Sequence, residues 1–159
     1  MPIITLVTEI NAPIEICFDL ARSIDLHMIS TAHTGEKAIA GRMSGLIEKN
    51  ETVTWRAKHF GISQTLTSLI TDCEPYHFFA DEMVSGAFKR FRHEHRFVQQ
   101  GAITIMTDTF DFESPLGVLG TIANKLFLTD YMTALLEGRN RTIKEYAENG
   151  KWKELLKRN

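Results

Sequence analysis

The pattern of hydrophobic and polar positions predicts a strand and two short helices at the start of the chain. Residues 3–10 are rich in Ile, Val and Thr and alternate loosely, which predicts a first strand. The Asn-Ala-Pro sequence at 11–13 suits a helix start, and apolar residues at helical spacing predict a helix to about Ile24. Residues 27–34 predict a second, shorter helix, and the soft segment 35–45 leads into the next strands.

From residue 46 to residue 113 the period of the apolar positions changes from 3.6 to 2. Turn signals recur in this region at 49–50, 60–61, 74–75, 85–86 and 100–101. Their spacing predicts a meander of about six antiparallel strands. A Ser-Pro pair at 114–115 then ends the last strand, and a wide apolar face predicts one long helix from about Leu116 to Glu148.

These elements predict an α+β fold. A seven-stranded antiparallel sheet curves around the long C-terminal helix, and two short helices follow the first strand. We expect one domain over 1–159, in which residues 150–159 form a short basic tail. A sheet that curves around a single helix cannot fill its whole concave side with side chains, so we expect a cavity between them.

The hairpin registers predict which side chains face the helix. A two-residue loop at 100–101 places His93 opposite Asp108 and Phe91 opposite Phe110. This face is mainly apolar and also holds His95, Phe97 and Met106. The opposite face is polar and is expected to meet solvent through Arg90, Arg92, Arg96 and Thr107.

The hairpin around residues 60–61 is interpreted in the same way. It places Trp55 opposite Leu66 and Gln64 opposite Ala57, and it directs His59 inward as well. The strand at 77–84 leaves two alternatives open. Either Phe79, Asp81 and Met83 or Phe78, Ala80 and Glu82 face the helix.

His93 and His95 are the sharpest local feature of the sequence. We interpret them, with Asp108, as hydrogen-bonded polar residues of a pocket. A His93–Asp108 pair could instead act as a catalytic acid–base dyad. Two histidines on one strand face also suit a metal, with Asp108 or His59 as a third ligand. We expect no metal, because no other metal-ligand spacing is present.

The chain resembles the START-like (SRPBCC, helix-grip) superfamily, in its bacterial polyketide cyclase/dehydrase-like ligand-binding branch. The residues that carry the likeness are 10–13 with Phe18, 52–55, 91–97, 114–120 and 126–127. The resemblance implies a deep pocket between sheet and helix that holds a small apolar ligand, and it brings no catalytic signature. We expect the ligand to contact Trp55, His59, Gln64, Phe91, His93, His95, Met106, Asp108, Phe110, Leu119 and Ala123.

Charge and composition narrow the function further. The chain of 159 residues carries 18 basic and 20 acidic residues, so no overall positive field favours nucleic acids. Its two cysteines form no CxxC pair, which argues against a disulfide framework or a thiolate zinc site. No apolar run reaches the length of a membrane helix. We expect a cytoplasmic protein without integral membrane association.

Three functions are compatible with the sequence. The leading hypothesis is binding or carriage of a small hydrophobic ligand, such as a lipid, an isoprenoid or an aromatic, polyketide-like compound, without a cofactor. The alternatives are a cyclase, dehydratase or hydrolase that uses His93 and Asp108, and a cell-division-associated interaction module. An enzyme needs an oriented acid–base pair within reach of a substrate, whereas a carrier needs shape and a few polar anchors.

Overall fold

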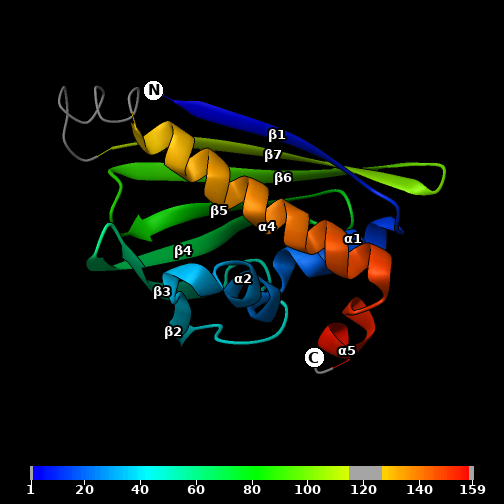
Figure 1. Cartoon of the computed structure of the whole chain (residues 1–159), viewed down its shortest axis with the longest axis horizontal. Helices are drawn as coiled ribbons and strands as arrows, with labels where there is room; N and C mark the ends of the chain where they lie inside the picture. Colours follow the sequence, from blue (N-terminus) through cyan, green and yellow to red (C-terminus); the bar gives the residue numbers. More distant parts are fainter. Residues whose placement is uncertain (1, 115–126, 158–159) are drawn as a thin grey trace.

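One antiparallel sheet of seven strands forms the body of the protein (Figure 1). A computed structural model describes residues 2–114 and 127–157. Its strands are β1 (Ile3–Ile10), β2 (Lys37–Gly41), β3 (Thr52–His59), β4 (Ile62–Glu74), β5 (Phe78–Ser85), β6 (Arg90–Gln100) and β7 (Ile103–Glu113). Their order in the sheet is β1-β7-β6-β5-β4-β3-β2. Strands β2 to β7 are therefore adjacent in sequence order, and only β1 pairs with a strand distant in sequence.

A long helix, α4 (Thr129–Asn149), runs diagonally across one face of the sheet (Figure 1). Its buried positions recur every three or four residues and form one stripe: Leu136, Arg139, Asn140, Ile143 and Ala147. Gly150 ends the helix in the left-handed conformation, with φ 83°. The prediction of a long helix packed on the sheet is confirmed. Its predicted first residues, with Leu119 and Ala123, lie outside the described residues.

The two short helices that follow β1 differ from the prediction in their boundaries. Helix α1 (Ile14–Arg22) ends earlier, and α2 (Ile24–Ser30) begins where α1 was expected to finish. The cause is Ser23, whose Oγ accepts a hydrogen bond from the backbone N–H of Leu26 at 3.1 Å and so caps α2. A single 3₁₀ turn, η1 (Ala32–Thr34), follows.

The soft segment at 35–45 contains an edge strand, β2, that the sequence analysis missed. The meander after residue 46 therefore has five strands, β3 to β7, rather than about six. Strand β2 is short and its register with β3 shifts between Ala38 and Ala40, so it shows no clear alternation. It ends at Gly41, whose φ is 72° and where a Cβ would overlap the backbone of Thr52.

The β6–β7 register differs from the prediction by two residues. His95, rather than His93, is directly opposite Asp108, and His93 is opposite Phe110. The two-residue loop lies at 101–102, because Gln100 still pairs with Ile103. Side chains alternate with a period of two, so a shift of two residues leaves every side chain on its predicted face. The predicted β3–β4 register, with Trp55 opposite Leu66, is confirmed.

The open question on β5 is also decided by strand pairing. Phe79 is opposite His95, and Asp81 is opposite His93. Directly paired residues of antiparallel strands share a face. Phe79 and Asp81 are therefore on the inner face with the two histidines, which selects the first of the two alternatives.

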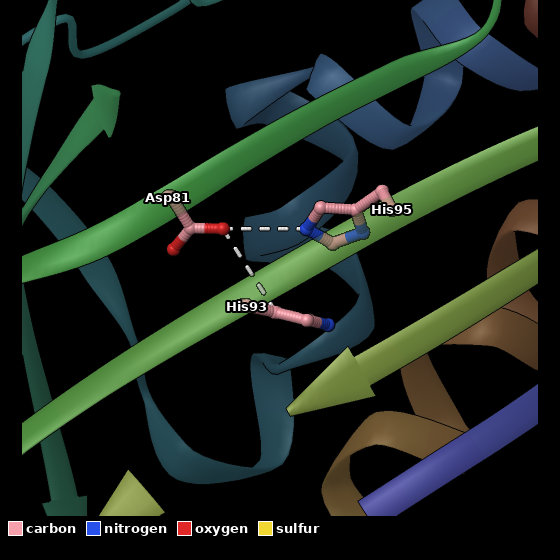
Figure 2. Close-up of side chains that lie close together, drawn as sticks. All are labelled: Asp81, His93 and His95. Atoms are coloured by element: carbon pink, nitrogen blue, oxygen red, sulfur yellow. Dashed lines mark hydrogen bonds and ion pairs between the residues drawn. The ribbon is translucent and has the colours of Figure 1, made fainter. Parts of the chain in front are cut away.

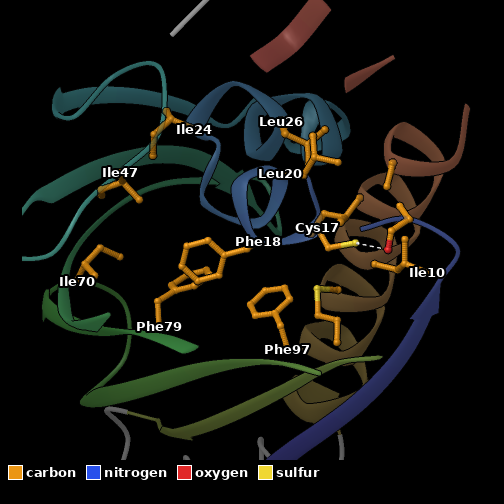
Figure 3. Packing of buried hydrophobic residues seen from close by; sticks show 14 of the residues in the cluster. Ile10, Cys17, Phe18, Leu20, Ile24, Leu26, Ile47, Ile70, Phe79 and Phe97 are labelled. Carbon is orange, nitrogen blue, oxygen red and sulfur yellow. Dashed lines mark hydrogen bonds between the residues drawn. The ribbon is translucent and has the colours of Figure 1, made fainter. Parts of the chain in front are cut away.

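Buried side chains fill the space between the sheet and the helices in two clusters. One gathers around Phe18 of α1, which packs edge-on against Phe79 and Phe97 (Figure 3). The other joins Phe91, Phe110 and Phe112 to α4. All predicted inner residues of the site region are at most 7% exposed: Trp55, His93, His95, Asp108 and Phe110.

The outer face of the sheet is mainly polar, as predicted, although Ile3, Val7 and Val98 are also exposed on it. Arg96 is exposed, whereas Arg90 and Arg92 are half-buried in ion pairs with acidic side chains of the same face. The predicted basic tail contains a short helix, α5 (Trp152–Leu156), whose apolar residues pack partly against the core. The C-terminal segment is thus attached to the domain by apolar contacts.

Candidate functional site

A cavity of about 470 Å³ lies between the sheet and α4. Several predicted ligand contacts line it: Trp55, His59, Gln64, Phe91, His93 and Phe110. Helix α4 supplies the opposite wall through Tyr131, Met132, Leu135, Leu136 and Arg139. His95 lines a smaller adjoining pocket, which it shares with Asp81 and His93. Asp108 and Met106 are fully buried behind the wall, so they do not line the cavity.

Aromatic side chains gather at the end of the cavity near the β3–β4 turn. The His59 Nδ1 and the Tyr131 hydroxyl lie 2.6 Å apart in a hydrogen bond. Phe60 at the turn packs on Tyr131 and on Phe127, with ring centroids 4.5 and 5.3 Å apart. Phe60 and Phe127 remain more than half exposed. Helix α4 and the β3–β4 hairpin are therefore joined by aromatic contacts at this end.

Asp108 is the centre of a buried polar network on the inner face. Its Oδ1 accepts a hydrogen bond from His95 Nδ1 at 2.7 Å, and its Oδ2 accepts one from Asn140 Nδ2 at 2.7 Å. The guanidinium of Arg139 lies 3.5 Å from Oδ1. His93 Nε2 also lies 3.2 Å from Oδ1, but without the alignment of a hydrogen bond. The predicted His93–Asp108 contact exists, yet His95 makes the better bond.

Asp81 extends this network toward the cavity. Its Oδ1 lies 3.3 Å from His95 Nε2 and 3.9 Å from His93 Nδ1 (Figure 2). The Asp81 side chain is 19% exposed, whereas those of His95 and Asp108 are almost fully buried. Each of the two imidazole rings is therefore placed between two carboxylates, with Asp108 on the core side and Asp81 on the cavity side.

The network shifts the pKa values of its members. Burial alone would raise the pKa of Asp108, but its contacts with His93 and His95 outweigh burial and hold the pKa well below its usual value. The pKa of Asp81 is lowered in the same way, against burial, by the hydrogen bond with His95 and by nearby positive charge. Burial and the neighbouring His95 lower the pKa of His93 to about 4. His93 is therefore neutral at pH 7.

A second polar group lies where α2 meets the cavity. The His27 ring stacks on Trp55 with centroids 4.2 Å apart, and its Nε2 lies 3.2 Å from a Glu36 carboxylate oxygen. Both His27 and Glu36 line the cavity. Burial would raise the pKa of Glu36, but the hydrogen bond from His27 lowers it. The cavity thus has polar groups at separate places on an otherwise apolar wall.

The sequence analysis missed four of these residues: His27, Glu36, Arg139 and Asn140. Arg139 and Asn140 were passed over because charged and amide side chains on a long helix usually face solvent. A signal was present, because both positions belong to the same helical stripe as Leu136 and Ile143. Glu36 lies in the segment that was interpreted as soft, so its side chain had no predicted direction.

Solved structures resemble the chain over most of its length. TTHA0849 from Thermus thermophilus superposes with a TM-score of 0.69 at 18% identity, covering 89% of this chain and 97% of that one. Ginseng major latex-like protein 151 from Panax ginseng has a TM-score of 0.67 at 16% identity, with 92% and 97% covered. Protein Ms6760 from Mycobacterium smegmatis has a TM-score of 0.66 at 14% identity, and the match covers 90% of this chain and 88% of that one.

The protein has the helix-grip fold. The START-like resemblance predicted this fold, and both the sheet order and the superposed structures confirm it. At these identities the likeness is one of fold. No family model matches the sequence, and no curated protein matches it either. Within the described residues, no helix of this helix-grip protein combines the length and apolarity that crossing a membrane requires.

Proposed function

We propose that this helix-grip protein binds and carries a small hydrophobic ligand in the cavity between its sheet and α4. The cavity of about 470 Å³ has the size of sites for small organic molecules, roughly 300–1,000 Å³. Its wall is mostly aromatic and aliphatic, with Trp55, Phe91 and Phe110 on the sheet and Leu135 and Leu136 on the helix. Such a wall favours a lipid, an isoprenoid or an aromatic, polyketide-like compound.

Two of the polar places on this wall are the proposed anchors. Asp81 and His93 line the inner side, and the hydrogen-bonded His59 and Tyr131 line the end near the β3–β4 turn. A buried polar group stabilises a complex only when the ligand satisfies it. We therefore propose an amphipathic ligand with an apolar body and one hydroxyl, carbonyl or carboxyl group.

One observation keeps the enzyme hypothesis as a second candidate. His93 lines the cavity and lies 3.2 Å from the buried Asp108 carboxylate. A general base works best with a pKa near the working pH, whereas the pKa of His93 is about 4. His93 is therefore a weak base, which supports carriage over acid–base catalysis.

Tryptophan fluorescence tests the proposal directly. Of the two tryptophans, Trp55 lines the cavity and Trp152 lies on α5, so Trp152→Phe isolates the signal of Trp55. Titration with a series of fatty acids, isoprenoid alcohols and aromatic polyketide analogues should change the emission saturably for at least one class. A linear response to all of them would reject the proposal.

A matched pair of substitutions shows whether binding occurs inside the cavity. Ala57→Phe adds a ring to the cavity wall, whereas Ala40→Phe adds the same ring at an exposed position of β2. We expect Ala57→Phe to weaken binding at least tenfold, or about 1.4 kcal/mol, and Ala40→Phe to leave it unchanged. Equal affinity of both variants would locate binding elsewhere.

A further inference from the structure

The two histidines of the inner face have more carboxylate contacts than a neutral imidazole can satisfy. His95 Nδ1 donates its proton to Asp108 at 2.7 Å. The other ring nitrogen, His95 Nε2, lies 3.3 Å from Asp81 Oδ1, and a ring with a single N–H can donate to only one of the two carboxylates. His93 lies between the same two carboxylates, 3.2 and 3.9 Å from them. Whichever nitrogen of His93 holds the proton, its other nitrogen also faces a carboxylate. A ring nitrogen without a proton that faces a carboxylate leaves a place for a cation between the two, and either a proton or a metal ion can occupy it.

We propose that Asp81, His93 and His95 form a binding site for a divalent transition-metal ion, for which Zn(II) is the probe. The ligand atoms would be Asp81 Oδ1, His93 Nδ1 and His95 Nε2, and Figure 2 shows dashed lines from Asp81 Oδ1 to each of the two rings. One ligand atom of each residue lies within 4.8 Å of those of the other two. Two imidazoles and a carboxylate are a ligand set of catalytic zinc and of non-haem iron.

The distances suit such an ion. With metal–ligand bonds of about 2.1 Å, tetrahedral ligand atoms are separated by about 3.4 Å. Asp81 Oδ1 lies 3.3 Å from the nitrogen of His95 and 3.9 Å from that of His93. Both separations are long for an N–H···O hydrogen bond, which is usually near 2.9 Å. To complete the geometry, His93 Nδ1 would have to move about 0.5 Å closer to Asp81 Oδ1, and the ligand atoms of the two histidines, which lie within 4.8 Å, would have to reach the same separation of about 3.4 Å.

Asp108 would support the ion from behind the ligands. Metal-binding histidines usually donate their second ring nitrogen to a carboxylate, which fixes the tautomer and the orientation of the ring. Asp108 accepts this bond from His95, lies beside His93, and is itself held by Asn140 at 2.7 Å. The buried network described above thus has the arrangement of an outer shell around a metal site.

The charge of the network also favours a cation. Asp81 and Asp108 contribute two negative charges, and Arg139 contributes one positive charge at 3.5 Å from Asp108. The two carboxylates therefore exceed the single guanidinium by one negative charge. A divalent ion bound by Asp81 and the two histidines would place positive charge between the two carboxylates.

The open side of the site faces the ligand cavity, because Asp81 and His93 both line it. Three protein ligands leave a fourth position for water or for an oxygen atom of a bound molecule. This last point alone rests on the proposed ligand function. The metal site itself needs no ligand, so the two proposals can fail separately.

The test uses tag-free protein that has been treated with a chelator and then titrated with Zn(II) by calorimetry. We expect one ion per chain, and Co(II) should give an absorption spectrum of a four- or five-coordinate site. Asp81→Asn, which keeps the shape of the side chain, should weaken Zn(II) binding by more than roughly 100-fold. Asp108→Asn, behind the ligands, should weaken it by about 10- to 100-fold.

His77→Ala is the matched control, because His77 is an exposed histidine outside the network. It should leave the affinity unchanged. Absence of saturable binding to the wild type would overturn the proposal, and so would binding to Asp81→Asn with the affinity of the wild type. Ring-proton NMR of the wild type gives a check that needs no variant. Zn(II) must shift the resonances of two buried histidines, and shifts confined to exposed histidines would refute the site.

Discussion

Replacing Asp108 by asparagine should destabilise the protein strongly, although it keeps the shape of the side chain. Asp108 is 1% exposed and accepts hydrogen bonds on both oxygens, from His95 and from Asn140, each at 2.7 Å. A carboxamide has only one oxygen, so it can accept only one of these two hydrogen bonds, and His95 would have to change its tautomer to accept from the NH₂ group. The substitution also removes the negative charge beside the buried guanidinium of Arg139.

The expected loss of stability in Asp108→Asn follows from these contacts. Removing one partner of a buried ion pair costs about 3–5 kcal/mol, since the other charge remains buried without compensation. For a protein of this size each kcal/mol lowers Tm by about 2–4 °C, which gives a decrease of roughly 6–20 °C. Urea unfolding at pH 7 measures the free energy of unfolding, and thermal melting measures Tm. Both are followed by circular dichroism with a chelator present.

Asp111→Asn is the matched control on the same strand. Asp111 lies on the outer face of β7, where it forms two contacts of 3.1 Å with Arg90 and its side chain is 34% exposed. Exposed pairs of this kind contribute about 0–1 kcal/mol. If Asp108→Asn destabilises the protein no more than Asp111→Asn does, the reasoning about a buried, charge-dependent network is wrong.

Three further predictions concern pH, thiol reactivity and backbone strain. The pKa of His93 falls from about 6.5 in the unfolded chain to about 4 in the folded protein, so its contribution to stability should be complete above about pH 6.5 and should fall by up to about 3 kcal/mol as the pH is lowered to 4. Urea unfolding at a series of pH values measures this change, and a flat profile would contradict the prediction. Burial raises the pKa of Cys17 to about 11, so a disulfide reagent should label the half-buried Cys73 long before Cys17 in the folded protein. Mass spectrometry distinguishes the two labelled sites, and equal labelling rates would refute the burial of Cys17. Gly41→Ala should lower the free energy of unfolding more than Gly35→Ala, as measured by chemical denaturation. Both positions have positive φ, which costs an alanine about 1–2 kcal/mol, but only at Gly41 would a Cβ also overlap the neighbouring strand. Similar losses of stability in the two variants would show that the edge strand adjusts freely.

Much of the fold could be predicted because period and turns act locally. The change from period 3.6 to period 2, and the Gly-containing turns, determine the strands and most of their faces. The β6–β7 register was wrong by two residues because a tight turn at 100–101 and one at 101–102 look alike in sequence. Every inner residue was still assigned to the correct face, since two residues are one full period.

The site could be predicted only in part, because its members come from distant elements. His93, His95 and Asp108 follow from one hairpin. Asp81 stayed open because β4 shifts its register with β5 at two places, and irregularities of this kind leave no signature in the alternation of side chains. Arg139 approaches Asp108 only when α4 lies across the sheet, and that crossing is a property of the tertiary packing.

The position of β1 has a consequence for the order in which the chain folds. Each pair of adjacent strands from β3 to β7 is also consecutive in the sequence. Strand β1 instead pairs with β7 at the far end of the meander, where Ile3 is opposite Asp111. On a ribosome that adds about 5–20 residues per second, the first strand emerges roughly 5–20 s before its partner is complete. Closing so long a loop is also entropically unfavourable until the meander supplies a formed edge. We therefore expect the N-terminal strand to join the sheet last, and until it docks the edge of β7 would be open to pairing with another chain.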